Sequence, residues 1–474
     1  MSVHGWSILV LVLIGLPMLA VGQDPPPAAD SSSATRAVPA GAVSGLVEAG
    51  TQSEDETSGD SLEIPAMLGG RTGSLAFLSE MDRSNYLRLG LNVGVAYDDN
   101  ALLSSSDQVG NTAFSVFPNI AISQSSSRMR WSLGYGAGLT VNQRFSNGNQ
   151  GTHNLNFDSE FRLSPHVNLR VAEEFSLTTG IFGANAGSDF QPGPGGANDT
   201  LLTPLANRRS STTTVEGSYH FALNDVVGAS GSFCDLHYSD VSTGPGTLVD
   251  ARTAKGSAFW LHEIFRRDWG GLSYTFQRMT FDPIGESRVH TFSVMDTFSV
   301  SKTFSVSAFV GPEYSDNHGV VASGPDAGQV SNFKKWSIAR EVEGNWRNGR
   351  TSVTAGYSNR ISDGGGVLGA VRLQDVHAAV RRELIPGWAA TLGVTHGSNA
   401  SLTLASFTTA ASIKTTSVGV SLERNVGRSL GFQIGYFHDF QNQSGSSDAS
   451  QNFDANRNRF SVTLSYQWAK SLGR

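Results

Sequence analysis

The sequence predicts an all-β protein, a single transmembrane antiparallel up-and-down β-barrel of about 18 strands preceded by a disordered N-terminal segment. Three observations support this prediction. From residue 86 onward, apolar residues alternate with polar or small ones. The alternating segments run about ten to thirteen residues, which suits a tilted strand that crosses a bilayer. The connections between them are alternately short and mostly long, as in outer-membrane barrels.

Composition narrows the possible functions. The chain has 474 residues, and only 16% of them are charged, against the usual quarter. The single cysteine, Cys234, excludes an intramolecular disulfide and a cysteine-based metal cluster. A net charge of −7, with both signs interspersed, argues against nucleic acid as a partner.

Residues 1–22 have the features of a signal peptide. An apolar run over residues 6–20 ends at Ala20-Val21-Gly22, which matches a small-x-small cleavage site. The run is short for a transmembrane helix. The first residues contain His4 but no Lys or Arg, so a short membrane anchor is the alternative to export.

Residues 23–84 are expected to form a disordered periplasmic tether. They include a Pro/Ala/Ser-rich stretch and the acidic stretch TQSEDETSGD, which cannot bury enough apolar surface to fold. Scattered apolar residues near the end of this segment suggest weak docking to a polysaccharide-secretion or other periplasmic partner. A simple linker is the alternative.

Residues 85–474 are expected to form the barrel. In LRLGLNVGVAYDDN, residues 87–100, an apolar phase ending at Tyr97 alternates with Arg88, Asn92 and small residues. Similar segments define 18 expected strands: 86–97, 113–123, 129–142, 153–163, 167–178, 212–223, 226–238, 253–265, 271–279, 288–300, 304–314, 335–346, 351–361, 372–384, 388–396, 413–424, 429–440 and 458–468. An even number of strands leaves both chain ends on the short-turn, periplasmic side.

Two turns predict specific strand pairings. Around Asn348-Gly349, a hairpin signal, we expect Trp346 to pair with Thr351, Val342 with Ala355 and Arg340 with Tyr357. Around Ser164-Pro165-His166, we expect the pairs Leu163 with Val167, Phe161 with Leu169 and Glu160 with Arg170. In both hairpins the apolar phases then share one face.

The apolar face is expected to contact lipid. Aromatic residues of this phase lie at both strand ends, as in the girdles of membrane barrels: Trp131, Trp346, Trp388 and Trp468 at the periplasmic ends, and Tyr97, Tyr314 and Trp336 at the opposite ends. Asp296 departs from this pattern, because it falls in the lipid-facing phase near mid-strand. Either a bulge shifts the phase there, or Asp296 contacts a partner subunit.

The polar face is expected to line a lumen wide enough for water and solutes. The candidate lumen-lining or selectivity residues are Arg88, Arg130, Glu160, Arg170, Glu341, Glu343 and Glu383. These charges either pair across strands and hydrate the wall, or form a selectivity field in which Glu341 and Glu343 favour cations. The longest external loop, 179–211, either folds into the bore or remains at the surface.

The motif YDDNALLS, residues 97–104, resembles the start of the β-barrel porin 2 family. This resemblance implies an outer-membrane protein, often linked to exopolysaccharide secretion. The last strand, residues 460–468, resembles the sorting signal of outer-membrane proteins, although six further residues follow its terminal aromatic.

No catalytic, cofactor or metal site is expected. Asp98, Asp99 and Asn100 could ligate calcium, but the EF-hand spacing is absent and a hydrated loop start is favoured. The eleven histidines show no HExxH motif. We therefore expect no enzyme but a passive channel in the bacterial outer membrane, for small polar solutes or for glycan export. The alternative is a structural or adhesion barrel with a filled lumen and interacting loops.

Overall fold

The computed structural model describes most of the chain beyond residue 84. The described ranges are 85–104, 107–144, 149–180, 202, 206–239, 248–265, 268–282, 285–301, 303–320, 330–366, 369–402, 412–427, 429–444 and 454–472. The predicted signal peptide and tether, residues 1–84, lie outside them. In the described part, no helix is long and apolar enough to cross a membrane.

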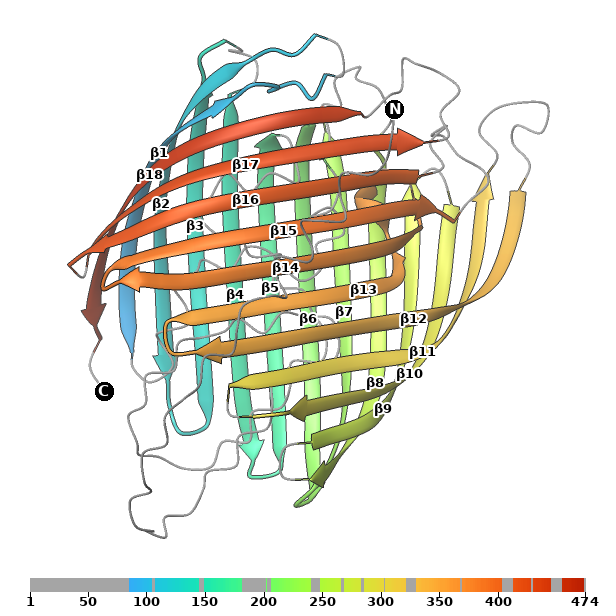
Figure 1. Cartoon of the computed structure of the whole chain (residues 1–474). Helices are drawn as coiled ribbons and strands as arrows, with labels where there is room; N and C mark the ends of the chain where they lie inside the picture. Colours follow the sequence, from blue (N-terminus) through green and yellow to red (C-terminus); the bar gives the residue numbers. More distant parts are fainter. Residues whose placement is uncertain are drawn as a thin grey trace, which may run out of the picture. The chain divides into compact units, whose positions relative to one another are not determined.

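Eighteen antiparallel strands make up the fold (Figure 1). They are β1 (Tyr86–Asp98), β2 (Asn111–Ser125), β3 (Met129–Asn142), β4 (Gln150–Ser164), β5 (Val167–Gly180), β6 (Ala206–Ala222), β7 (Asp225–Ser239), β8 (Asp250–Phe265), β9 (Asp268–Asp282), β10 (Gly285–Ser299), β11 (Phe304–Val320), β12 (Val330–Asn348), β13 (Thr351–Ser362), β14 (Val371–Ile385), β15 (Trp388–Ser401), β16 (Ser412–Val426), β17 (Leu430–Ser444) and β18 (Ala455–Ser471). A short 3₁₀ turn, η2 (Gly364–Gly366), follows β13.

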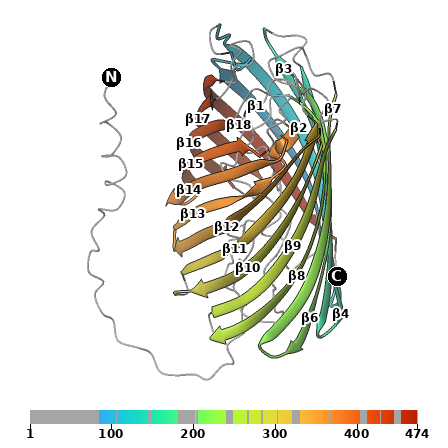
Figure 2. The same ribbon diagram turned by 90° about the vertical axis from the view of Figure 1, so that its right-hand side faces the viewer.

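Each strand pairs with its neighbours in the sequence, and β1 also pairs with β18, so the sheet closes into an up-and-down barrel (Figure 2). The predicted all-β barrel of 18 strands is confirmed. Several strands extend beyond their predicted ends on the long-loop side. For example, β12 begins at Val330 rather than at residue 335.

The two faces of the sheet follow the predicted alternation. On β1 the outward side chains are Leu89, Leu91, Val93, Val95 and Tyr97, which are 37–52% exposed, whereas the residues between them are less exposed. Comparable large apolar side chains are exposed on every strand pair around the barrel. The exterior is therefore an apolar belt, and the alternate residues line the interior.

The pairing registers test the two predicted hairpins. Phe161 pairs with Leu169 and Glu160 with Arg170, as expected. A bulge after Arg162 makes Ser164, not Leu163, the partner of Val167.

The register predicted around Asn348-Gly349 is wrong by two residues. Trp346 pairs with Val353, Val342 with Tyr357 and Arg340 with Asn359. The turn consists of only Gly349-Arg350, and the positive φ of Gly349, 51°, permits it. A shift of two residues preserves the phase, so the apolar faces still coincide.

Asp296 is outward-facing, as predicted, but no bulge lies beside it. The β9–β10 pairing is continuous from Gly285 to Phe298, with Asp296 opposite Gly270. Asp296 lies three residues before the end of β10, and its carboxyl interacts with that of Asp268, the first residue of β9. The residue therefore lies toward the periplasmic edge of the barrel rather than at mid-strand. A charge costs less near this edge than at the bilayer midplane.

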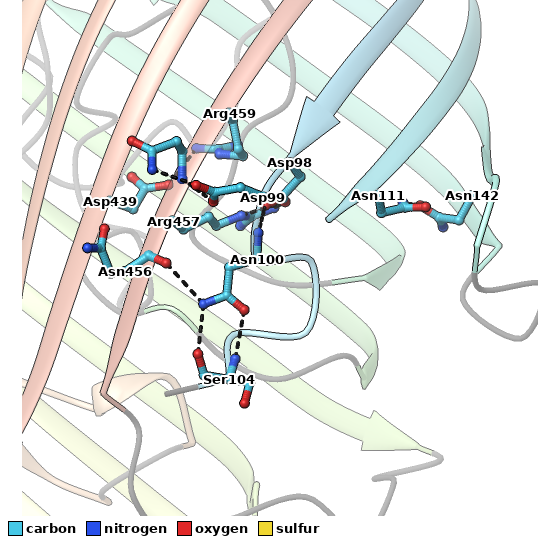
Figure 3. Close-up of polar contacts among 11 residues, drawn as sticks. Asp98, Asp99, Asn100, Ser104, Asn111, Asn142, Asp439, Asn456, Arg457 and Arg459 are labelled. Carbon is cyan, nitrogen blue, oxygen red and sulfur yellow. Dashed lines mark hydrogen bonds and ion pairs between the residues drawn. The ribbon is translucent and has the colours of Figure 1, made fainter. Parts of the chain in front are cut away.

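The residues that end the first strand join it to the last one (Figure 3). Asp98 accepts a hydrogen bond from Arg457 Nε at 2.6 Å, and Asp99 accepts two from Asn458 at 2.6 and 2.7 Å. Asn100, fully buried, donates to the backbone oxygen of Asn456 at 3.0 Å. These contacts occupy the acidic oxygens that had suggested calcium and secure the β1–β18 seam at its extracellular end.

We predict that Val93→Arg lowers the free energy of unfolding by about 2–4 kcal/mol, because it places a charge in the middle of the lipid-facing belt. Asn92→Arg, one residue earlier and inward, should cost much less. Urea titration of the protein folded in lipid vesicles measures both. Equal losses for the two variants would contradict the assignment of faces.

We predict that Asp98→Asn lowers the free energy of unfolding by about 3 kcal/mol, since it leaves the buried Arg457 guanidinium without its carboxylate. Asp107→Asn, on the exposed loop after the same strand, is the control and should be nearly neutral. Urea titration in the same vesicles gives the comparison. A seam variant as stable as the control would refute this role of Asp98.

Candidate functional site: the lumen and its extracellular mouth

The structure places the predicted lumen residues on the inward phase of their strands. Arg130, Glu160 and Arg170 come from β3, β4 and β5 and lie opposite one another in a single paired row. Glu216 of β6 extends this row. Arg170 donates to Asp158 at 3.0 Å and interacts electrostatically with Glu160 and Glu216. This part of the wall is a network of alternating charges rather than a field of one sign.

The second predicted group lies on β12. Glu341 lies 3.7 Å from Arg360 of β13, and Glu343 accepts a hydrogen bond from Asn345 at 2.8 Å. Lys255, on β8, interacts electrostatically with both Glu341 and Arg360. Sequence reasoning missed Lys255, because nothing in the sequence indicates that β8 and β12 interact across the interior.

The remaining two candidates lie on other strands, β1 and β14. Arg88 lies on β1 between Ala121 of β2 and Ala469 of β18. Glu383 lies at the periplasmic end of β14, next to a bulge and opposite Ala389. A nearby inward ion pair, between Arg381 and Glu423 at 2.7 Å, was also not predicted as a pair.

Part of the inner wall is apolar, which was not predicted. Buried side chains on β7–β12 pack together in an inner-wall cluster that consists of Val226, Phe259, Leu261, Trp269, Met295, Phe309 and Ala339. Phe259 and Leu261 share the inward phase of β8 with Lys255, whereas Trp260 between them is 40% exposed on the outside. The inner wall therefore contains a packed apolar region beside its charged groups.

The connection between β13 and β14 crosses the extracellular mouth. The Tyr238 hydroxyl of β7 donates to the backbone oxygen of Gly365 at 2.7 Å. The Val249 amide, just before β8, donates to the backbone oxygen of Gly366 at 2.9 Å. Because β8 and β13 are five strands apart in a closed barrel, these contacts require the segment to extend across the mouth.

A buried carboxylate fixes the base of this segment. The β12–β13 pairing stops at Arg340 and Asn359, although β12 continues to Val330. Beyond that point, Glu313 of β11 accepts hydrogen bonds from the Ile361 amide at 3.3 Å and from Arg372 at 3.0 Å. These bonds pass over β12, so the end of the β13–β14 hairpin lies inside the barrel wall. We call the described residues of this hairpin end, 361–366 and 369–371, the mouth segment.

Apolar side chains surround the mouth segment. This mouth cluster consists of Ala206, Leu236, Tyr238, Leu248, Val249, Ala251, Met279, Phe281, Val289, Ile361, Ala370, Val371, Leu402 and Ile413. Its members lie in or next to β6–β10 on one side and in or next to β13–β16 on the other. The cluster narrows the extracellular mouth with a packed apolar layer.

The third external loop also contributes inside the barrel, at its one described residue. Leu202 is 3% exposed, and its amide and backbone oxygen bond to the Gln441 side chain of β17 at 2.8 and 3.0 Å. Since β5 and β6 flank this loop, Leu202 lies against the far side of the barrel. Of the two alternatives for this loop, the position of residue 202 favours the one in which the loop folds into the bore; the rest of residues 181–205 lies outside the described ranges.

The described inner wall carries paired charges and neutral hydrogen-bonding groups. Across the described ranges, no group of three or more His, Cys, Asp or Glu residues is arranged to hold a metal ion. The inward charges are mostly paired, as between Arg170 and Asp158 or between Arg459 and Asp439. Such a wall exposes both positive and negative side chains, and both hydrogen-bond donors and acceptors, toward the interior.

Comparison with known proteins finds solved outer-membrane structures that resemble the chain at low identity. No family model and no curated protein matches the chain. Solved structures that resemble it include the outer membrane protein OpdK of Pseudomonas aeruginosa, at 10% identity over 81% of this chain and 99% of that chain, with a TM-score of 0.41. OccAB1 of Acinetobacter baumannii matches at 10% identity over 81% and 96%, with a TM-score of 0.41. The ferric-catecholate import receptor Fiu of E. coli K12 matches at 9% identity over 82% of each chain, with a TM-score of 0.44. These similarities concern the fold alone.

The location follows from the barrel itself. Because β1 pairs with β18, the sheet has no edge strand, and this closure is the condition for β-strands to span a hydrocarbon layer. Its exterior carries an apolar belt with aromatic residues at both ends, such as Trp346 and Trp468 at one end and Tyr97 and Trp336 at the other. The chain is an outer-membrane β-barrel.

We predict that Tyr238→Phe loosens the mouth segment, because it leaves the buried backbone oxygen of Gly365 without its donor. A cost of about 1–3 kcal/mol should speed hydrogen exchange at the Val249 amide by about 5- to 150-fold. Tyr436→Phe removes an equivalent hydroxyl from the outer surface and serves as the control. Unchanged exchange at Val249 in Tyr238→Phe would show that this bond does not hold the segment.

Proposed function

We propose that the protein is a passive channel for small polar solutes across the outer membrane, with its narrowest region at the mouth cluster. The observation that carries this proposal is the polar, charge-paired inner wall. It includes the Arg130–Glu160–Arg170 row on one side and the Lys255, Glu341 and Arg360 group on another. Ionisable residues inside a barrel need water or charged partners, and a hydrated lumen supplies the water.

The pairing of these charges supports a channel of weak ionic selectivity. Glu341 lies near the permanently charged Arg360, whereas Glu343 accepts a hydrogen bond from the neutral Asn345 amide and interacts electrostatically with His377. Glu343 is therefore the residue through which a modest cation preference would act. Solutes that carry several hydroxyl groups also fit a wall of mixed donors and acceptors.

Glycan export belongs to the same proposal as a more specific form of it. It rests on the resemblance of residues 97–104 to the β-barrel porin 2 family, and it assigns residues 23–84 to docking of a periplasmic secretion partner. Deleting residues 23–84 from the mature chain should then leave channel activity intact in a bilayer but abolish glycan export by cells. If the deletion abolishes both channel activity and glycan export, or abolishes neither, the segment does not have that role.

The alternative is a structural or adhesion barrel with a filled lumen. The mouth cluster favours it, because packed apolar side chains join opposite sides of the wall. The inner-wall cluster adds further packed volume inside the barrel. The two functions differ in ion flow, which can be measured directly.

Single-channel recording of the refolded mature chain in a planar bilayer tests the proposal. We expect stable conductance steps in the wild-type protein, and larger or more frequent steps in Tyr238→Phe. A folded barrel that stays silent in both forms would overturn the channel function and favour the filled barrel.

We predict that Glu343→Gln shifts the reversal potential in a salt gradient toward lower cation preference, because it removes an inward carboxylate. Asp282→Asn, at the exposed extracellular end of β9, is the control and should leave the reversal potential unchanged. An equal reversal potential in all three proteins would show that Glu343 does not contribute to selectivity.

A further inference from the structure

The outer surface of β6–β12 carries a repeated charge arrangement at its extracellular end. In each of three groups, one carboxylate contacts two basic side chains. Asp235 lies 3.4 Å from Arg209 and 3.0 Å from Arg252. Glu286 lies 2.6 Å from Arg278 and 2.5 Å from Arg288. Asp316 lies 3.2 Å from His318 and 3.8 Å from Lys334. We call these nine residues the basic rim.

The basic rim faces outward, not into the lumen. Arg252 shares its strand phase with Trp260, Arg278 with Leu272, and Arg288 with Phe292, and these three apolar side chains are 40–54% exposed. Thr280 of β9 pairs with Arg252 of β8 on one side and with Glu286 of β10 on the other. The first two groups therefore lie on neighbouring strands. The rim is therefore a continuous strip directly above the lipid-facing belt.

Three carboxylates, Asp250, Asp282 and Glu286, lie on the solvent side of the arginines, whereas Asp235 and Asp316 lie level with Arg252 and Arg288. On β8, Arg252 is two residues nearer to the belt than Asp250, which His237 contacts. On β9, Arg278 is four residues nearer than Asp282. On β10, Arg288 is two residues nearer than Glu286.

The carboxylates orient the guanidinium groups without covering them. Arg252 contacts Asp235 through Nε, and Arg288 contacts Glu286 through Nε. The four arginine side chains are 50–73% exposed, whereas the two carboxylates are 19–25% exposed. An arginine held through Nε still presents its terminal N–H groups, which match the geometry of a phosphate.

The opposite flank of the barrel differs at the same level. Outward residues near the extracellular ends of β15–β18 are mostly uncharged and include His396, Thr416, His438, Asn442 and Asn458. Lys414, outward on β16, is a basic residue on this flank. The basic rim is thus a property of one side of the barrel, not of its whole circumference.

We propose that the basic rim binds the phosphate groups of lipids in the outer leaflet of the outer membrane. Phosphates of a lipid headgroup lie at the border of the hydrocarbon layer, which is the level of the arginine row. The acyl chains of the same lipid would lie on the exposed apolar side chains below, such as Leu272 and Phe292. This combination favours a phosphorylated lipid over free phosphate, and it is independent of the channel function.

The test uses the full mature chain, refolded in neutral detergent, with lipid A as the phosphorylated probe. The affinity for bisphosphorylated lipid A should fall by about tenfold or more in Arg252→Gln/Arg278→Gln/Arg288→Gln, which removes charge-assisted bonds to phosphate. Lys414→Gln, on the opposite flank, should bind like the wild-type protein. Circular dichroism and heat-modifiable gel mobility confirm that each variant is folded.

Two further probes identify the source of the phosphate. Dephosphorylated lipid A should bind at least tenfold more weakly to the wild-type protein, and inorganic phosphate should not compete at millimolar concentration. Equal affinity of the triple variant and the wild-type protein for lipid A would overturn the proposal. Effective competition by inorganic phosphate would replace the lipid with a free anion and would also overturn it.

Discussion

Closure of the sheet is the constraint on which the rest of this structure depends. A strand edge in hydrocarbon would leave backbone N–H and C=O groups without partners, at a cost of several kcal/mol each. The first and last strands must therefore pair along their whole length, and Asp98, Asp99 and Asn100 add side-chain bonds from β1 to β18. The abrupt end of the apolar alternation after Tyr97 thus marks the seam as well as the membrane border.

Closure also separates two environments that the same strands must satisfy. Outward residues meet lipid and then headgroups, so the belt is apolar and the charges begin only at its edges. Inward residues meet each other, and the barrel satisfies them in two ways. On β3–β6 and β12–β14 they form charge pairs, whereas on β7–β12 they form a packed apolar cluster. The lumen is therefore asymmetric, although the strand pattern is uniform.

The mouth segment connects this asymmetry to the proposed function. Glu313 and Arg372 hold its base inside the wall, and Tyr238 holds its far end on β7. A channel whose narrowest part is one hairpin end can be widened by a small movement of that hairpin, without breaking the membrane-spanning pairs. Leu202, in the loop between β5 and β6, hydrogen-bonds to Gln441 of β17. Residues from two connections, β5–β6 and β13–β14, therefore lie inside the extracellular mouth.

The sequence by itself determined the strand number, the face of each strand and the common side on which β1 begins and β18 ends, because a period of two and the loop lengths are local properties. It also determined local pairs such as Glu160 with Arg170, since a short turn leaves few registers. The register at Trp346 depended on a two-residue turn that the residues alone left ambiguous. Only the tertiary structure brought Lys255 to Glu341, packed Phe259 inside and placed the mouth segment against Tyr238. Those contacts join strands that are distant in the chain, and the curvature of the closed barrel, not any local pattern, decides which of them meet.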